Sequence, residues 1–473
     1  MSAKKPKKRK YRFVRRLLRV LLGIAILFFL LYLFIRSPWG QNIIVDKATN
    51  YVSSKTNTTV EIDKAFITFD GNLKVEGLFL NDKKGDTLIY SKSLEANLPL
   101  WGLINGTALG VDDVKWNGLK ANIIRKDTVS GYNFQFLMDT FATNSTTTVA
   151  KDTTTTSPEI VIGSLNLSEI DVVYIDIPLG IESRFKIGEL ETNIETVDVE
   201  KMVFSINDLN LLNSNIKYIQ KPVLITSAEE APLPKLSAEN ITIKNTKVYY
   251  KAEESNLLAD LNLVDAEIEN PNLNLQESIF KIDKFALRDS QTLVEMQSKS
   301  NSNSQTTNSE FIWPAITLDV KEIEIENNSI NYIANNTKIN KNAFDANAIS
   351  LQDVNLKAST IFYKDKNAGL LIDTFNFNET SGINLEKLNL NVQLTDKNLD
   401  VTNLDVELNK NKLKANASVS YSSFSQFMAS PETAKLKVSL SSFNIFLKEL
   451  FKIEPSLRNN KIINDLSKKP FTG

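Results

Sequence analysis

Most of this chain after about residue 57 alternates apolar and polar residues with a period of two. The clearest case is a run in which Leu404, Val406 and Leu408 lead to a turn at Asn409–Asn411, and a second alternating run, from Leu413 through Val419, returns. Alternation predicts half-buried strands, because successive strand side chains point to opposite faces of a sheet. The sequence therefore predicts a mostly β fold built on a long, twisted antiparallel sheet, with only short helices.

One apolar pattern repeats along the chain: two apolar pairs, each of the form apolar-x-apolar, separated by four other residues. The copies begin at Val114, Leu165, Ile241 and Ile323, so they are spaced by 51, 76 and 82 residues. Three copies end in Tyr. This irregular spacing favours one sheet extended by modules with variable loops over a strict solenoid.

We interpret each copy as a hairpin whose two-residue turn places all four apolar side chains on one face. Asn245-Thr246 and Asn327-Asn328 suit such a turn because Asn tolerates positive φ, whereas Glu169-Ile170 does not. The residues predicted to line this apolar face are Val114, Trp116, Leu165, Leu167, Val172, Tyr174, Ile241, Ile243, Val248, Tyr250, Ile323, Ile325, Ile330, Tyr332, Leu404, Val406, Leu408, Leu413 and Val419.

The N-terminal part is organised around Val20–Ile35, which is 16 residues long and carries no charge. Leu17 and Leu18 extend it across Arg19, and a helix over 17–35 is roughly 28 Å long, close to the hydrocarbon thickness of a bilayer. Ten of the first 19 residues are basic and none is acidic: Lys4, Lys5, Lys7, Lys8, Arg9, Lys10, Arg12, Arg15, Arg16 and Arg19. The positive-inside rule then predicts a cytoplasmic N-terminus and an exported body.

Two alternatives explain the same N-terminal residues. A cleaved signal peptide is disfavoured because no small-x-small cleavage pattern follows Ile35. A nucleic-acid-binding or nuclear-localisation arm is disfavoured because the adjacent apolar run accounts for the charges. We therefore predict an uncleaved anchor.

The predicted segments follow from these shifts in composition. They are a basic tail (1–16), a transmembrane helix (17–35), an amphipathic juxtamembrane helix (36–56), an N-terminal β module that closes with a short helix near Gly131–Phe141 (57–141), a low-complexity loop (142–157), β modules (158–296), a polar loop (297–310) and further β modules (311–473). Ser37-Pro38 is typical of a helix start.

Composition excludes several classes of function. The chain has no Cys and no His, which removes disulfides, Cys–zinc sites, cysteine nucleophiles and imidazole catalysis. Less the ten N-terminal cations, 45 basic residues face 56 acidic ones, so the body carries about −11 and gives no reason to expect nucleic acid. There is no Gly-rich phosphate loop and no G-x-S-x-G motif. We expect no enzyme, cofactor or metal.

A one-sided apolar sheet has two interpretations. It is either one wall of an ordinary β-sandwich core or the lining of an open, curved groove that holds something apolar. The aliphatic lining, the predicted anchor and the scarcity of helices favour a groove suited to acyl chains.

The order of features resembles the inner-membrane subunit of the bacterial translocation and assembly module (the TamB family), within the AsmA-like group of bridge-like lipid-transfer proteins. The resemblance rests on the basic tail and span, the segment SPWGQNIIVDKATNYVS, and the two strand modules VEIDKAFITFDGNLKVEGLFLNDKKGDTLIYSKSLEANL and PLWGLINGTALGVDDVKWNGLKANIIRKD, followed by GYNFQFLMDTF. It covers residues 1–140 best. Members of that family are longer and end in a C-terminal domain that this sequence lacks, so we expect an N-terminal portion.

The resemblance implies a single-pass protein of the bacterial inner membrane with most of its chain in the periplasm. It implies an apolar β-groove for passive phospholipid transfer toward the outer membrane, or for outer-membrane protein assembly with a barrel partner, and it carries no catalytic residues over. The alternative function is a membrane-tethered structural or adhesive β-protein with a closed core and no lipid cargo.

Overall fold

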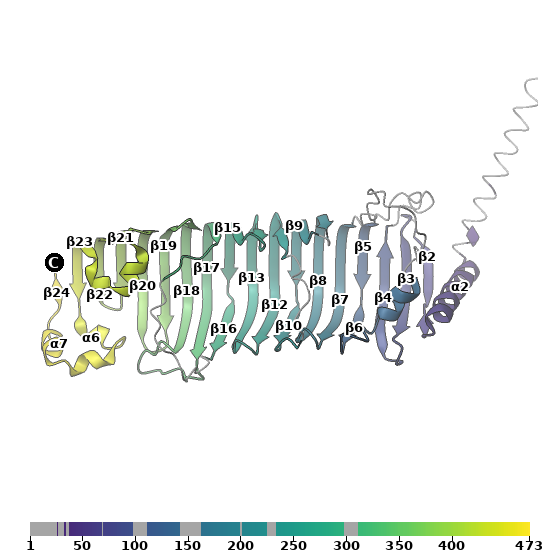
Figure 1. Ribbon diagram of the computed structural model, residues 1–473, viewed down its shortest axis with the longest axis horizontal. Coiled ribbons are helices and arrows are strands. Elements are labelled where there is room, and N and C mark those ends of the chain that lie inside the picture. The colour runs from purple at the N-terminus through teal and green to yellow at the C-terminus, as the bar shows by residue number, and fades with distance from the viewer. Residues whose placement is uncertain are drawn as a thin grey trace, which may run out of the picture. The chain divides into compact units, whose positions relative to one another are not determined.

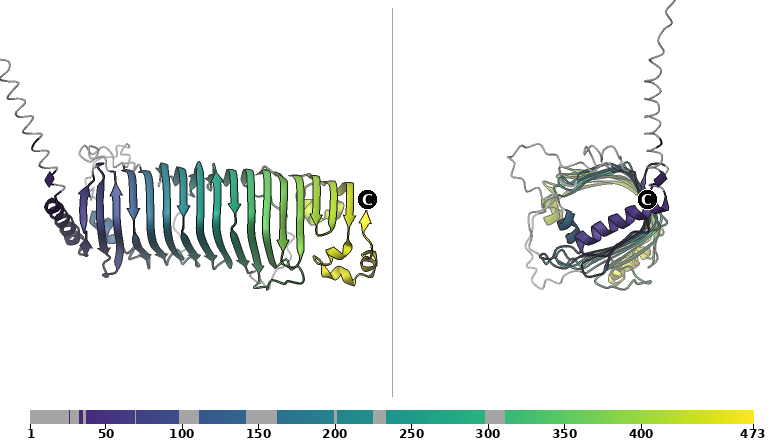
Figure 2. Two further views of the ribbon diagram at one scale, coloured as in Figure 1. Left: turned by 180° about the vertical axis from the view of Figure 1, so that it is seen from behind. Right: turned by 90° about the vertical axis from the view of Figure 1, so that its right-hand side faces the viewer.

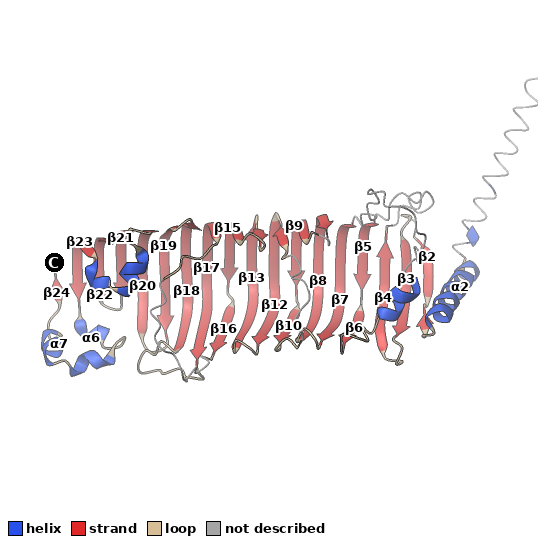
Figure 3. Cartoon of the chain, in the orientation of Figure 1, coloured by secondary structure: helices blue, strands red, loops and turns tan. Residues whose placement is uncertain are grey.

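The computed structural model describes residues 26, 33–34, 37–68, 70–97, 111–141, 162–198, 201–224, 233–297 and 311–473 (Figure 1). The chain divides into unit 1 (Met1–Ala121 and Asn133–Glu159) and unit 2 (Asn122–Tyr132 and Ile160–Gly473). Strands dominate both units and helices are short and few (Figure 3), so the predicted mostly β class is confirmed.

Unit 1 begins with helix α2 (Pro38–Thr56), which packs on its first strands and on a short helix, α4. Ser37 caps α2 by accepting a hydrogen bond from the Gly40 N–H at 3.0 Å, as its sequence predicts. The helix buries Val45, whereas Tyr51 is 56% exposed. The other elements of unit 1 are β1 (Val60–Glu61), β2 (Lys64–Ile67), β3 (Leu73–Asn81), β4 (Thr87–Ala96), β5 (Val111–Asn117), the start of β6 (Lys120–Arg125), and α4 (Gln135–Phe141).

Several predicted segments fall outside the described residues. These are the basic tail 1–16 with nine of the ten topology-determining cations, the tenth cation Arg19, the loop 142–157, and all but the first residue of the loop 297–310. The predicted span 17–35 is described only at Ile26, Leu33 and Phe34. Within the part of the chain that the structure describes, no helix combines the length and hydropathy needed to cross a membrane.

Unit 2 is a long sheet whose strands lie side by side and curve along their length (Figure 2). Its strands are β7 (Ile162–Asp176), β8 (Ile181–Asp198), β9 (Val203–Leu212), β10 (Asn215–Gln220), β11 (Lys235–Ser237), β12 (Asn240–Ala252), β13 (Leu257–Glu269), β14 (Asn272–Asn274), β15 (Ile279–Arg288), β16 (Gln291–Met296), β17 (Thr317–Ala334), β18 (Ala348–Lys364), β19 (Asn367–Glu379), β20 (Ile383–Thr395), β21 (Asn398–Leu408), β22 (Asn411–Ser420), β23 (Lys435–Ile445) and β24 (Phe471–Thr472). Its helices are α5 (Phe424–Ala429), α6 (Leu447–Leu450) and α7 (Lys461–Leu466), with 3-10 turns at Pro431–Thr433 and Pro455–Asn459.

The sheet of unit 2 is mixed, which corrects the predicted antiparallel sheet. β12 runs parallel to β9 and β10, and β17 runs parallel to β15 and β16. β10 and β16 both end at one set of strand ends. The chain re-enters the sheet at the opposite strand ends, so the strands that follow run parallel to the ones before. From β17 to β23 the order is a simple antiparallel meander, including the predicted β21–β22 hairpin.

The predicted hairpins at three repeat copies are wrong. Each copy lies in one long strand: the first in β7, the second in β12 and the third in β17. Leu167 pairs with Leu190 of β8 and Val172 with Phe185 of β8, rather than with each other. The fourth copy, at Val114, is likewise an interrupted strand, β5 and β6, broken at Gly118 where φ is +66°.

A residue in the left-handed region takes the place of the predicted turn in each long strand, at φ 54° for Glu169, 49° for Asn245 and 52° for Asn327. In β17 the pairing with β18 also shifts register there, which marks a bulge. A residue that interrupts the pleat reverses the alternation of side chains, so apolar residues five apart return to the same face. A hairpin and a bulge therefore give the same sequence spacing.

These bulges align across the sheet in a line that we call the central bulge line. Its positive-φ residues are Glu169, Asn213, Asn245, Asp289, Asn327 and Asp353. They are linked laterally: the Asn213 N–H donates to the Lys244 carbonyl, and the Asn327 side chain donates to Asp289 Oδ1 at 2.6 Å. Because bulges bend a strand and increase its twist, an aligned set bends the whole sheet at one level. Asn270 and Thr360, also at positive φ, mark a second line toward the other strand ends.

Candidate functional site

The apolar side chains of unit 2 form four rows that run across the strands, two on each side of the central bulge line. Together we call these rows the apolar face. Row 1 is Leu165, Thr192, Leu209, Ile241, Ile268, Phe285, Ile323 and Ala358; row 2 is Leu167, Leu190, Leu211, Ile243, Ala266, Leu287, Ile325 and Leu356; row 3 is Val172, Phe185, Ile216, Val248, Leu261, Thr292, Ile330 and Leu351; row 4 is Tyr174, Ser183, Tyr218, Tyr250, Ala259, Val294, Tyr332 and Ile349.

The apolar face brings together the twelve predicted lining residues from the three copies in β7, β12 and β17. Leu404, Val406, Leu408, Leu413 and Val419 belong to the same sheet farther along, where Val406 pairs with Leu413 and Leu404 with Ala415. Val114 and Trp116 lie in unit 1, where they pair with Ala96 and Leu94. They therefore belong to a different unit from the four rows.

No predicted lining residue is buried. Each keeps part of its surface exposed, and Tyr250 reaches 36%. Among the described residues, Leu88 and Val354 are the only large apolar side chains with less than 2% of their surface exposed. A β-sandwich buries large apolar side chains between its two sheets. The lining residues in the described part of unit 2 therefore keep more exposed surface than the core of a β-sandwich does.

Four polar residues on the bulge line were missed by the sequence reasoning: Ser214, Thr246, Ser290 and Asn328. Each directly follows a positive-φ residue and is at most 4% exposed. The hydroxyls of the first three donate to the carbonyl two residues earlier, at 2.8–3.0 Å. Their hydroxyls are thus satisfied by backbone groups. An Asn or Asp followed by Ser, Thr or Asn between apolar pairs is the sequence signal for this arrangement.

Asn328 is the most fully connected of these residues. It accepts from the Ser290 N–H at 2.8 Å and donates to the carbonyls of Leu287 at 2.7 Å and Glu326 at 2.9 Å. Its side chain thereby joins β17 to the bulge between β15 and β16.

The opposite face of the sheet carries charge. Arg288 lies 3.2 Å from Asp265, 3.6 Å from Glu267 and 3.5 Å from Glu324. A hydrogen bond from Lys284, followed by nearby cationic charge, lowers the pKa of Glu324. The two faces of the sheet therefore differ sharply, as expected where one face meets water.

A buried ion pair closes one end of row 4. Asp176 is fully buried and lies 2.7 Å from the Arg125 guanidinium. The Tyr132 hydroxyl donates to Asp176 Oδ2 at 2.9 Å and contacts the Tyr174 hydroxyl at 3.0 Å. Burial opposes ionisation of Asp176, but the hydrogen bonds from Arg125, the Leu179 N–H and Tyr132 outweigh it and lower its pKa. Burial also raises the pKa of Tyr132, so its hydroxyl stays protonated.

An aromatic cluster gathers at the opposite strand ends, around β18 to β22. Trp313 stacks on Tyr363 with ring centroids 5.9 Å apart, and Phe424 of α5 lies 5.0 Å from Trp313. The Trp313 indole N–H donates to Asp396 at 3.0 Å, and this bond is the main reason that the pKa of Asp396 is lowered. Phe311 and Tyr421 complete the cluster, which fixes α5 against the end of the sheet.

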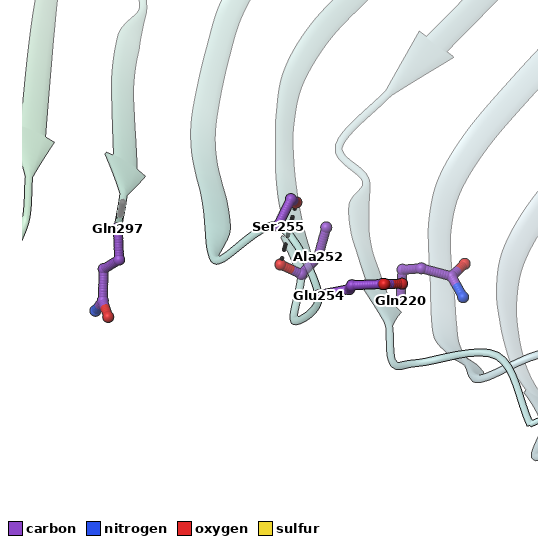
Figure 4. A pocket seen from close by; sticks show the side chains of 5 residues that line it. All are labelled: Gln220, Ala252, Glu254, Ser255 and Gln297. Carbon is purple, nitrogen blue, oxygen red and sulfur yellow. Dashed lines mark hydrogen bonds between the residues drawn. The ribbon is translucent and has the colours of Figure 1, made fainter. Parts of the chain in front are cut away.

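Two cavities among the described residues of unit 2 bear on the apolar face. One, of about 470 Å³, lies among the ends of β10, β12 and β16 and is lined by Gln220, Ala252, Glu254, Ser255 and Gln297 (Figure 4). The other, of about 460 Å³, lies at the central bulge line beside Lys186 and Lys247. No group of three or more acidic side chains among the described residues is placed to hold a metal ion.

Comparison with known proteins does not identify a family for this chain. No protein-family model matches the chain, and no curated protein sequence matches it. Any functional conclusion therefore rests on the chain's own residues.

Proposed function

We propose that the chain is a membrane-anchored lipid-transfer protein whose apolar face carries phospholipid acyl chains. The observation that supports this most directly is the continuous set of apolar rows, whose predicted lining residues all keep part of their surface exposed. Eight paired strand positions are separated by seven spacings of ~4.8 Å, which gives a face about 34 Å long. The acyl chains of one leaflet span about 15 Å, half of the hydrocarbon core. The face is thus long enough for acyl chains to pass from one strand position to the next.

The chemistry of the face suits passive movement. Its side chains are mostly Ile, Leu and Val, and each methylene removed from water gains about 0.8 kcal/mol. Because the rows repeat from strand to strand, an acyl chain meets similar contacts at each position and no single deep pocket traps it. The basic N-terminus and the apolar run 17–35 support an anchor in the bacterial inner membrane, with the body exported. Transfer toward the outer membrane, alone or with an assembly partner, is the role we propose for it.

Photo-crosslinking tests this function. A photoreactive amino acid replaces Ile243 or Ile325 on the apolar face of the full chain, and Lys244 or Glu326 on the charged face in matched controls. We expect covalent phospholipid adducts, detected by mass spectrometry after purification from cells, at the first two positions only. A folded protein with no adduct at Ile243 and Ile325 would contradict lipid transfer and favour a structural or adhesive role.

A further inference from the structure

The polar groups of the apolar face are unevenly distributed between its two margins. Row 4 contains four tyrosines, at Tyr174, Tyr218, Tyr250 and Tyr332, which we call the tyrosine rim. Row 2 is wholly aliphatic, and rows 1 and 3 contain no Tyr. Phenolic hydroxyls are therefore confined to the margin at one set of strand ends.

Contacts at the tyrosine rim show an apolar-to-polar boundary. The rings of Tyr218 and Tyr250 stack with centroids 5.8 Å apart and planes at 13°. The Tyr218 hydroxyl donates to Gln220 Oε1 at 3.0 Å, one alternate position nearer the strand end. Tyrosine rings of this kind, with an apolar body and a polar tip, concentrate where hydrocarbon meets water.

The cavity of about 470 Å³ lies directly beyond this boundary. Glu254 and Ser255, in the turn after β12, lie between Gln220 and Gln297 (Figure 4). Its lining offers a carboxylate, two carboxamides and a hydroxyl, and no cationic side chain. Such a lining favours groups that donate hydrogen bonds, such as an ammonium or a hydroxyl, over a bare phosphate.

We infer that a phospholipid on the apolar face is oriented across the strands, with its headgroup at the tyrosine rim and its acyl chains toward row 2. The cavity beyond the rim then takes an amine or hydroxyl of the headgroup. This inference rests on the proposed function and adds the orientation and the headgroup chemistry. It follows from the placement of the phenolic hydroxyls in row 4, at one margin, and of purely aliphatic side chains in row 2.

Site-directed fluorescence quenching tests the orientation, and the absence of native cysteine makes each label unique. The full chain carries a bimane label at Val294→Cys in the tyrosine rim row, at Ile325→Cys in row 2, or at Glu295→Cys on the charged face. The protein is loaded with phospholipid bearing a nitroxide on the headgroup or at the chain end, and is then separated from vesicles.

We expect the headgroup nitroxide to quench more strongly than the chain-end nitroxide at position 294, and the reverse at 325. Equal ratios at both positions, with both quenched, would overturn the orientation and leave lipid binding intact. No quenching at either position, or equal quenching at 295, would overturn the proposed function itself.

A second variant tests the hydroxyls directly. Replacing Tyr218, Tyr250 and Tyr332 together by Phe keeps the rings, and we expect the dissociation constant for phosphatidylethanolamine to rise about fivefold for each hydroxyl that contacts the headgroup. Tyr249→Phe is the matched control, because Tyr249 pairs with Lys217 and Asp260 outside the apolar rows. An unchanged affinity and quenching ratio in the triple variant would contradict headgroup recognition by the rim.

Discussion

Asn328→Ala is the sharpest test of the central bulge line. Asn328 is 1% exposed and makes three hydrogen bonds, to the Ser290 N–H and to two carbonyls. A buried N–H left without a partner costs about 2 kcal/mol, and each carbonyl about 1 kcal/mol because it has a second lone pair. We therefore expect the free energy of unfolding to fall by about 4 kcal/mol.

The measurement is urea unfolding of the purified full chain, followed by circular dichroism of its strands. Asn342→Ala, at an exposed loop position, is the control and is expected to change stability by less than about 0.5 kcal/mol. Asn328→Ser is expected to lose about half as much as Ala, because the serine at Ser290 already donates to the carbonyl two residues earlier. A loss below about 1 kcal/mol for Asn328→Ala would refute a structural role for the bulge line.

Two further variants test the fold at other points. Asp176→Asn leaves the Arg125 guanidinium without its counter-charge and should lower the free energy of unfolding by about 3–5 kcal/mol at neutral pH. Because the folded-state pKa of Asp176 lies below its ordinary 3.8, the stability difference between native and variant chains should persist above pH 3.8 and disappear as the pH falls through the folded-state pKa. Urea unfolding at several pH values would show this. Gly188→Ala would place a Cβ 2.5 Å from the Asn213 carbonyl oxygen across the bulge line. We expect the free energy of unfolding to fall by about 1–3 kcal/mol and amide hydrogen exchange in β8 and β9 to become faster. Native exchange rates in that variant would refute close packing at Gly188.

The alternation of apolar residues was enough to predict the strands, because period two has one structural meaning over long runs. The helix at Pro38–Thr56 was also predictable, since Ser37 and Pro38 mark its start. The long strands were not predictable from the repeat copies. Apolar residues five apart, as in Leu167 and Val172, return to one face through a hairpin or through a bulge, and local sequence does not separate the two.

Strand direction was missed for a related reason. A polar connection can close a hairpin or carry the chain back across the sheet, and only the register of Ile216 with Val248 or of Thr292 with Ile330 shows which. The polar residues on the bulge line were missed because a buried Ser or Asn looks like a loop residue when its partner is backbone. Both errors concern pairing between distant segments, which a single strand's composition does not encode.

The aligned positive-φ residues and the partly exposed apolar face bear on function together. A single sheet with one apolar face is unfavourable in water unless something shields that face. Bending every strand at the same level turns the two halves of the apolar face toward each other. The residues at the bend are hydrogen-bonded to backbone groups, so the curvature of the sheet does not depend on a packed core. A ligand that covers the face stabilises the folded state by its own binding free energy. On the proposed function, we expect the stability of unit 2 to depend on an apolar occupant. Delipidation followed by thermal unfolding should then show a lower melting temperature that added phospholipid restores.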